Sequence, residues 1–149
     1  MSNVIGYAVG AFDLFHVGHL NLLRQARSRC DFLIVGVATD ELLVERKGRS
    51  PIIPFSERLE IVQNIGYVDS AVEECSSNRL DAWKANPFDV YFKGDDWKGT
   101  PKGAAIEREF STVGVKVIYF PYTVHTSSTI LRTTLDKINS GTADYRVAR

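Results

Sequence analysis

Hydrophobic runs alternate along this chain with segments whose apolar residues recur at helical spacing, and this alternation decides the fold class. Runs with the pattern of buried strands occupy 4–10, 32–39, 70–74, 88–94 and 115–120. Helical spacing predicts helices over 20–28, 54–65, 79–86, 103–114 and about 127–139. Strands that alternate with helices favour an α/β fold, in which helices cover both faces of a parallel sheet.

Length and charge restrict the kind of protein further. A chain of 149 residues can bury one core unaided, and without a repeat or linker we expect one domain over 1–140 followed by a tail at 141–149. The 18 basic and 18 acidic side chains balance, so no general attraction to nucleic acid is expected and any anion site must be local. Because no leader or apolar run of ~20 residues is present, we expect a cytoplasmic protein that does not insert into membranes.

The cysteine content agrees with a reducing compartment. Cys30 and Cys75 lie far apart in the sequence and fit no C-x-x-C spacing. We therefore expect both to be free, partly buried thiols, as is usual in a cytosolic protein.

Two histidines follow the first predicted strand, in the segment GAFDLFHVGH (10–19). Ligands of such sheets gather beyond the carboxyl ends of the strands, where this segment lies. Gly10 allows a sharp turn, and Gly18 leaves the amides of a helix start open to an anion. Because i and i+3 share a helix face, His16 and His19 can point at the same phosphoryl group. The alternatives are two surface histidines, or half of a zinc site, for which only His125 remains as a further histidine ligand.

This segment resembles the G-x-F-D-x-x-H-x-G-H motif of cytidylyltransferases in the nucleotidyltransferase superfamily. The resemblance continues through 36–42, 51–62, 67–72 and 94–99, and GDDWKG is most similar to glycerol-3-phosphate cytidylyltransferases. It implies a single Rossmann-like domain that transfers CMP from CTP to an alcohol phosphate, most simply glycerol 3-phosphate. The products would be a CDP-alcohol and pyrophosphate.

The resemblance also implies roles for the residues of the motif. His16 and His19 would bind the triphosphate and stabilise the α-phosphorus during attack, and Lys47 would join them as a catalytic cation. Asp13 either braces the loop or contacts the substrate. The nucleotide would also be bound by Gly10, Ala11, Phe12 and Gly18.

Basic side chains follow the second strand as well. Lys47 lies in a glycine-containing segment, 39–54, which we expect to be a mobile loop over the phosphates, with Arg46 and Arg49 beside it. Arg58 matches a family arginine that contacts the substrate or the triphosphate. Its alternative is a weak surface ion pair along the helix, worth about 0.3 kcal/mol.

The segment GDDWKG follows the fourth strand, so its side chains belong to the same edge of the sheet. Adjacent acidic side chains diverge, which argues against an acid/base pair. The resemblance places Asp95 at the nucleotide and Asp96 with Trp97 at the alcohol phosphate. An aromatic-capped turn without a ligand is the alternative.

The match weakens after the fifth strand. Thr123, Ser127 and Thr129 agree with the family, whereas Tyr122 replaces an arginine and His125 a glycine. Ser127, Ser128 and Thr129 can still start a helix that holds phosphates. His125 and Arg132 are the side chains available to replace the lost charge. Gly66 is a second departure, near the dimer contact of the family.

The resemblance implies Mg²⁺ bound mainly through the nucleotide phosphates, no metal site of the protein itself, and a homodimer. One alternative is the same chemistry on phosphoethanolamine, phosphocholine or another polyol phosphate, or with ATP. A more distant alternative is a nucleotide-binding module that no longer turns over.

Overall fold

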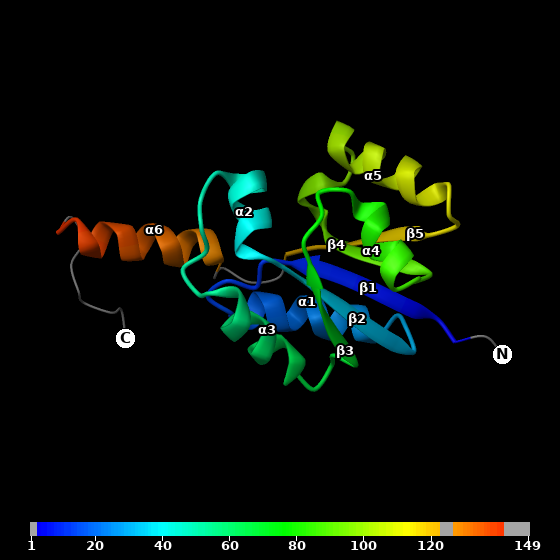
Figure 1. Cartoon of the computed structure of the whole chain (residues 1–149), viewed down its shortest axis with the longest axis horizontal. Coiled ribbons are helices and arrows are strands. Elements are labelled where there is room, and N and C mark those ends of the chain that lie inside the picture. Colours follow the sequence, from blue (N-terminus) through cyan, green and yellow to red (C-terminus); the bar gives the residue numbers. More distant parts are fainter. Residues whose placement is uncertain (1–2, 123–126, 142–149) are drawn as a thin grey trace.

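The structure is a computed structural model that describes residues 3–122 and 127–141. The strands are β1 (Ile5–Gly10), β2 (Phe32–Ala38), β3 (Ser70–Glu74), β4 (Val90–Gly94) and β5 (Lys116–Phe120). The helices are α1 (Val17–Arg27), α2 (Asp40–Lys47), α3 (Phe55–Gln63), α4 (Arg79–Ala85), α5 (Pro101–Ser111) and α6 (Ser128–Asn139), with a short 3₁₀ turn, η1 (Asp95–Trp97). Together they form a single α/β domain around one sheet (Figure 1).

The strand order explains where a ligand can enter. All pairings are parallel, and the order is β3-β2-β1-β4-β5. The chain first adds strands on one side of β1 and then crosses over to add β4 and β5 on the other. The order therefore reverses between β1 and β4, and a crevice opens beyond the carboxyl ends of such neighbouring strands.

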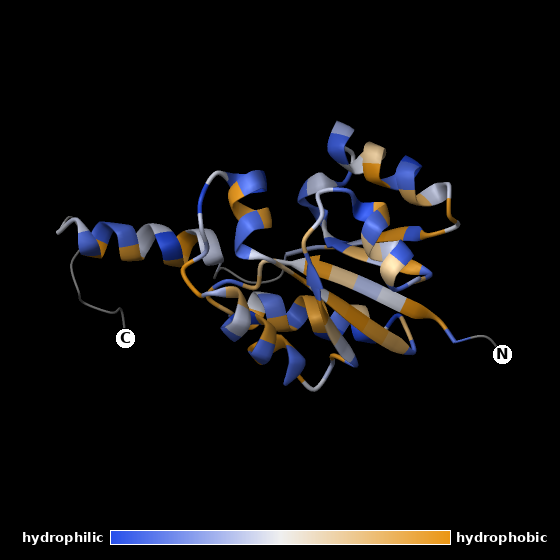
Figure 2. Ribbon diagram, viewed as in Figure 1, coloured by the Kyte–Doolittle hydropathy of each residue, from blue (hydrophilic) through white to orange (hydrophobic). Residues whose placement is uncertain are grey.

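Helices cover both faces of the sheet, as predicted. α1 and α3 lie on one face, and α2, α4 and α5 lie on the other (Figure 1). The apolar stripes of these helices turn toward the strands, whose residues are hydrophobic on both faces (Figure 2). One core cluster joins Leu23, Ala26 and Val62 to the first face, and a second joins Tyr7, Tyr91 and Phe110 on the other.

All the predicted strands and helices are present, with ends shifted by a few residues, but α2 was missed. Its sequence, DELLVERK, places apolar residues next to one another and lacks a helical repeat. The signals that were present are caps: the Thr39 side chain accepts a hydrogen bond from the amide of Leu42, and Gly48 ends the helix with φ +72°. The expected mobile loop therefore begins as a capped helix.

Three remaining features concern the periphery. α6 extends beyond the carboxyl ends of the strands, away from the two helical layers (Figure 1). No helix within the described residues is long and apolar enough to cross a membrane. Both cysteines are free, as predicted, although Cys75 is exposed and only Cys30 is buried.

Candidate active site

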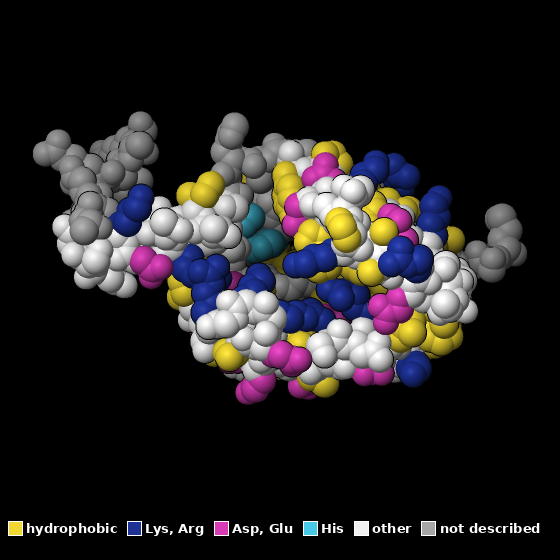
Figure 3. Space-filling view, turned by 90° about the horizontal axis from the view of Figure 1, so that it is seen from above, with side chains coloured by type: hydrophobic (Ala, Val, Ile, Leu, Met, Phe, Trp, Pro, Cys, Tyr) yellow, Lys and Arg dark blue, Asp and Glu magenta, His cyan; other side chains and the backbone are white. Residues whose placement is uncertain are grey.

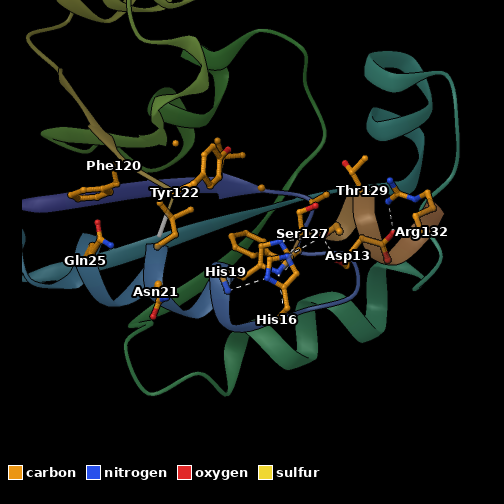
Figure 4. Close-up of a pocket in the computed structure, with 18 of the residues that line it drawn as sticks. Asp13, His16, His19, Asn21, Gln25, Phe120, Tyr122, Ser127, Thr129 and Arg132 are labelled. Atoms are coloured by element: carbon orange, nitrogen blue, oxygen red, sulfur yellow. Dashed lines mark hydrogen bonds and ion pairs between the residues drawn. The ribbon is translucent and has the colours of Figure 1, made fainter. Parts of the chain in front are cut away.

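A cavity of about 400 Å³ lies at the point where the strand order reverses. Its walls come from the carboxyl ends of β1, β4 and β5, from α1, and from the start of α6 (Figure 4). Many of the predicted site residues line it: Gly10, Ala11, Phe12, Asp13, His16, Gly18, His19, Lys47, Ser127, Ser128, Thr129 and Arg132. Residues from three separate predicted segments, 10–19, 39–54 and the helix at about 127–139, thus meet at one cavity.

The loop from β1 to α1 is tightly folded. Phe12 and Leu14 adopt left-handed backbone conformations, with φ of 53° and 51°, which non-glycine residues rarely adopt. Asp13 lies between them and is 1% exposed. Its carboxylate accepts hydrogen bonds from the amides of Ile52 and Ile53, each at 2.9 Å. The loop is therefore strained locally and fixed by long-range bonds, an arrangement typical of functional sites.

Asp13 acts here as a brace. Besides the two amides, its Oδ2 accepts a hydrogen bond from Arg132 at 2.8 Å. Burial would raise the pKa of Asp13, but the hydrogen bonds from Ile52, Ile53 and Arg132 outweigh it and hold the pKa below its ordinary value. Of the two roles considered from sequence, the structure thus provides direct evidence for the bracing one.

His16 and His19 form a reciprocal cap at the start of α1. The Nδ1 atom of His16 accepts a hydrogen bond from the amide of Gly18 at 3.0 Å. The Nδ1 atom of His19 accepts one from the amide of His16 at 3.3 Å. The two rings stack with their centroids 4.0 Å apart, so both imidazoles are held in place by backbone groups.

This cap determines where each ring carries its proton. Because both Nδ1 atoms accept hydrogen bonds, each neutral ring must be protonated on Nε2. Burial lowers the pKa of His16. Burial, followed by the neighbouring His16, lowers the pKa of His19 to about 3. Both rings are therefore neutral near pH 7, and each presents one Nε2–H donor.

The two donors converge on the first residue of α6. Ser128 Oγ lies 3.4 Å from the Nε2 atoms of both His16 and His19. The hydroxyl itself donates to the carbonyl of Asp13 at 2.6 Å. Ser127 caps α6 by accepting a hydrogen bond from the amide of Ile130. The donors and the amino end of a helix thus meet at one place, which suits an anion.

Two cations complete this end of the cavity. Arg132 is held by Asp13, and its Nε atom is buried without a hydrogen-bond partner among the described residues. Lys47, the last residue of α2, also lines the cavity. Partial removal from water, followed by the charges of Arg132 and Arg49, lowers the pKa of Lys47. A bound anion would relieve this repulsion between cations.

Arg58 has a different role from the predicted one. It is 1% exposed, and its guanidinium donates to the carbonyls of Ala11, Ala38 and Ile53 at 2.6–2.8 Å. It also pairs with Asp40 at 2.7 Å. Arg58 does not line the cavity, so the predicted contact with a ligand is replaced by a brace that joins the ends of β1 and β2 to α2 and α3.

The GDDWKG segment also departs from the prediction. Asp95, Asp96 and Trp97 form η1 and do not line the cavity, whereas Gly94 does. Tyr122 donates a hydrogen bond to Asp96 at 3.2 Å. A Cβ atom at Gly94 would lie 2.6 Å from the Tyr122 hydroxyl, so the glycine makes room for the tyrosine. The side chain that replaces the family arginine therefore forms part of the cavity wall.

Sequence reasoning missed one end of the cavity. Asn21 and Gln25 of α1 lie there with Phe120 and Tyr122, at the other side of the histidines from Arg132 (Figure 4). Helical spacing is the signal that could have found them, because Gly18, Asn21 and Gln25 lie three and four residues apart on one face. Two predicted residues, Thr123 and His125, lie outside the described residues.

The possible metal ligands of the described residues do not gather into one group. Among residues 3–122 and 127–141, no group of three or more His, Cys, Asp or Glu side chains could hold a metal ion. The carboxylate in the cavity, Asp13, already accepts hydrogen bonds at both oxygens. These residues therefore do not form a cage for Mg²⁺.

Comparisons with known proteins agree with this geometry. The family model described as cytidylyltransferase-like matches residues 7–135. The chain belongs to the cytidylyltransferase-like family. It is a nucleotidyltransferase.

Individual relatives cover most of the chain. It is 33% identical to the glycerol-3-phosphate cytidylyltransferase of Bacillus spizizenii, over 89% of this chain and 95% of the relative. It is 38% identical to the FAD synthase of Pyrococcus abyssi, over 76% of this chain and 77% of that relative. A solved lipopolysaccharide core biosynthesis protein from Thermoplasma volcanium shares the fold, with a TM-score of 0.70 and 23% identity over 84% of this chain and all of that one.

Proposed function

We propose that this enzyme transfers CMP from CTP to an alcohol phosphate, with glycerol 3-phosphate as the first candidate, and releases a CDP-alcohol and pyrophosphate. The observation that carries the proposal is the convergence of the two Nε2–H donors of His16 and His19 at the start of α6. Similarity to a glycerol-3-phosphate cytidylyltransferase over nearly the whole chain supports the choice of substrates.

The reaction needs positioning and charge stabilisation more than covalent chemistry. An oxygen of the acceptor phosphate attacks the α-phosphorus of CTP. The bond from that phosphorus to the bridging oxygen breaks, and pyrophosphate leaves with the electron pair. His16 and His19 donate hydrogen bonds to phosphate oxygens whose negative charge grows during this step. No protein nucleophile takes part.

Arg132 and Lys47 supply the positive charge in this proposal. The family arginine is Tyr122 here, so another cation must face the triphosphate. Arg132 lines the same cavity and has a buried Nε–H without a partner among the described residues. A charged contact of this type is worth about 1.5–3 kcal/mol. Among the donors considered from sequence, Arg132 is the one that the described structure supports.

The opposite end of the cavity suits a nucleoside. The Phe120 ring gives an apolar surface, and the amides of Asn21 and Gln25 can both donate and accept hydrogen bonds, as the edge of a base requires. The histidines lie between this end and Arg132 (Figure 4). A nucleotide would therefore extend along the cavity with its phosphates toward α6.

Mg²⁺ would enter as part of the substrate. Because Asp13 already accepts hydrogen bonds at both oxygens and no other carboxylate of the described residues lines the cavity, the triphosphate oxygens and water would be its ligands. The ion would neutralise part of the phosphate charge. The roles of the protein residues do not depend on it.

The homodimer implied by the family is also part of the proposal, as is a cytoplasmic location. α6 buries none of its residues fully, and Ile130 and Leu135 are 54% and 39% exposed. A second copy of the chain would cover these side chains. Sedimentation of the Leu135→Glu variant tests this, because loss of the dimer is expected, and an unchanged dimer would place the interface elsewhere.

The direct test of the reaction is pyrophosphate release from CTP and ATP with a panel of acceptors: glycerol 3-phosphate, phosphoethanolamine, phosphocholine and FMN. We expect turnover with CTP and glycerol 3-phosphate, and a CDP-alcohol identified by ³¹P NMR. Turnover with ATP and FMN alone would favour the activity named for the Pyrococcus relative. Tight CTP binding without product in any pair would instead indicate a binding module.

His19→Ala tests the mechanism. If the ring stabilises charge in the transition state, kcat falls about 100-fold or more. Arg108→Ala, an exposed residue of α5, serves as the control and should retain full activity. Full activity of His19→Ala would contradict the role assigned to the histidine.

A further inference from the structure

A second group of cations lies next to the candidate active site and was not predicted. It consists of Arg46 from α2, Arg79 from α4 and Lys93 from β4, and we call it the basic groove. Arg46 and Lys93 directly precede Lys47 and Gly94, which both line the cavity, so the groove adjoins it. Lys and Arg side chains gather around the hollow beside the histidines (Figure 3).

Two of the three cations of the groove lie over one aromatic ring. Lys93 Nζ lies 3.8 Å from the centroid of the Trp97 ring, and the Arg79 guanidinium lies 5.2 Å from it. Such contacts with a ring face orient a cation without neutralising it. Trp97, which sequence reasoning assigned to the substrate, thus orients two cations of the groove.

One buried carboxylate anchors the opposite wall. Glu74 is 4% exposed, lies 3.5 Å from Arg46 through Oε2, and accepts a hydrogen bond from Tyr7 through Oε1 at 3.4 Å. Tyr7 reaches it by lying across Gly36, where any side chain would collide with the tyrosine hydroxyl. Glu74 is a positioning residue, because it lies beneath the groove and fixes Arg46.

The groove has an excess of positive charge. Three cations face one carboxylate, that of Glu74, whose pKa is raised by burial and lowered by the neighbouring Arg46 and Arg79. Burial lowers the pKa of Lys93. The negative charge of Asp96 opposes this shift, and the neighbouring cations add to it. Asp96 is exposed and bonded to Tyr122. A ligand that brings oxygen atoms would be stabilised here, and a ligand that brings a positive charge would be repelled.

We infer that the basic groove, through Lys93, selects an acceptor whose non-phosphate end carries oxygen atoms and no positive charge. This rests on the proposed function, because the acceptor phosphate must reach the histidines and Lys47. The rest of the acceptor then extends over the groove. A polyol phosphate or sugar phosphate fits this environment, whereas the ammonium groups of phosphoethanolamine and phosphocholine do not.

The test uses calorimetric binding of glycerol 3-phosphate and phosphoethanolamine to the CTP-free enzyme, with turnover measured separately. The unmodified protein should bind glycerol 3-phosphate more tightly. Lys93→Met should weaken that binding about tenfold and leave phosphoethanolamine unaffected or improved. Lys93→Glu should reverse the preference. Lys98→Met, an exposed lysine just beyond η1, is the matched control and should change neither affinity.

The outcomes separate the two proposals. Binding with the expected preference but without turnover would leave the selectivity intact and overturn the proposed function. Turnover with an unchanged preference in both Lys93 variants would overturn the role of the groove. The role of the groove would also be overturned if the unmodified protein bound the two phosphates equally well, or bound neither. Circular dichroism of each variant shows whether a loss of binding reflects unfolding.

Discussion

The two ends of the site are built in different ways. At the histidine end, backbone groups hold the functional side chains: amides donate to both Nδ1 atoms of His16 and His19, and to both oxygens of Asp13. In the basic groove, side chains hold one another, through the Trp97 ring and the Glu74 carboxylate. The histidine end thus holds its atoms at fixed positions, and the basic groove concentrates positive charge.

This difference suits the two tasks. Stabilising a phosphoryl transition state requires donors at fixed positions, because a small displacement costs much of the rate. Selecting the far end of an acceptor requires an electrostatic environment that tolerates movement. Variants of the histidine end should therefore alter stability or kcat, and variants of the groove should alter acceptor binding.

The largest expected effect on stability comes from Arg58→Met. The change removes the donors that serve the carbonyls of Ala11, Ala38 and Ile53 and leaves Asp40 unpaired. Leaving buried acceptors without donors should lower the free energy of unfolding by about 3–5 kcal/mol. Thermal unfolding measures this loss of stability, and we expect a decrease in Tm on the order of 10 °C.

The control for this prediction is Arg108→Met on the exposed face of α5, which should shift Tm little. A small change in the Tm of Arg58→Met would mean that the carbonyls find other donors, and that the Arg58 brace contributes little to stability. A direct ligand contact by Arg58 would instead change substrate binding without changing Tm.

His16→Asn separates the two functions of the first histidine. Asparagine is a good N-cap, so it can accept the hydrogen bond from Gly18, but it cannot place a donor where the Nε2–H lies. We expect stability to stay within about 0.5 kcal/mol of the unmodified protein, while kcat falls about 100-fold. His16→Ala should lose about 1 kcal/mol in addition. Equal activity of His16→Asn and the unmodified protein would assign His16 to capping alone.

The fold and the histidine end were predictable because their signals are local. The alternation of strands and helices defines the sheet, and the segment 10–19 carries both histidines in ten consecutive residues. α2 was not predicted because Leu42, Leu43 and Val44 are adjacent and do not show a helical repeat, although Thr39 and Gly48 are typical capping residues. Caps of this kind are weaker signals than periodicity.

The differences between the predicted and the observed positions of the site residues have one cause. Arg58 and Trp97 were assigned to ligands from their motifs, but whether a side chain turns toward a cavity depends on partners far away in the sequence. Arg58 is turned inward by carbonyls from three other segments, and Trp97 by cations from α4 and β4. The basic groove was not predicted for the same reason, because its residues come from separate elements of the chain.

The smallest expected effect is a pH dependence of stability that arises at the histidine end. The pKa of His19 is about 3 in the folded protein and 6.5 as an ordinary value. Between these values the unfolded state binds the extra proton, so stability falls as pH decreases below about 6.5. The slope contributed by one such group approaches 1.4 kcal/mol per pH unit at most.

His19→Gln should reduce this slope, measured as the free energy of unfolding in urea from pH 7 to 5. Comparing the two proteins isolates the histidine, because Glu74 acts in the opposite sense: burial raises its pKa, so its contribution decreases as pH rises. Glu74 is unchanged in both proteins. If the two slopes coincide, His19 is protonated as readily in the folded state as in the unfolded one, and because a protonated Nδ1 cannot accept the hydrogen bond from the His16 amide, the cap would not be what holds this ring.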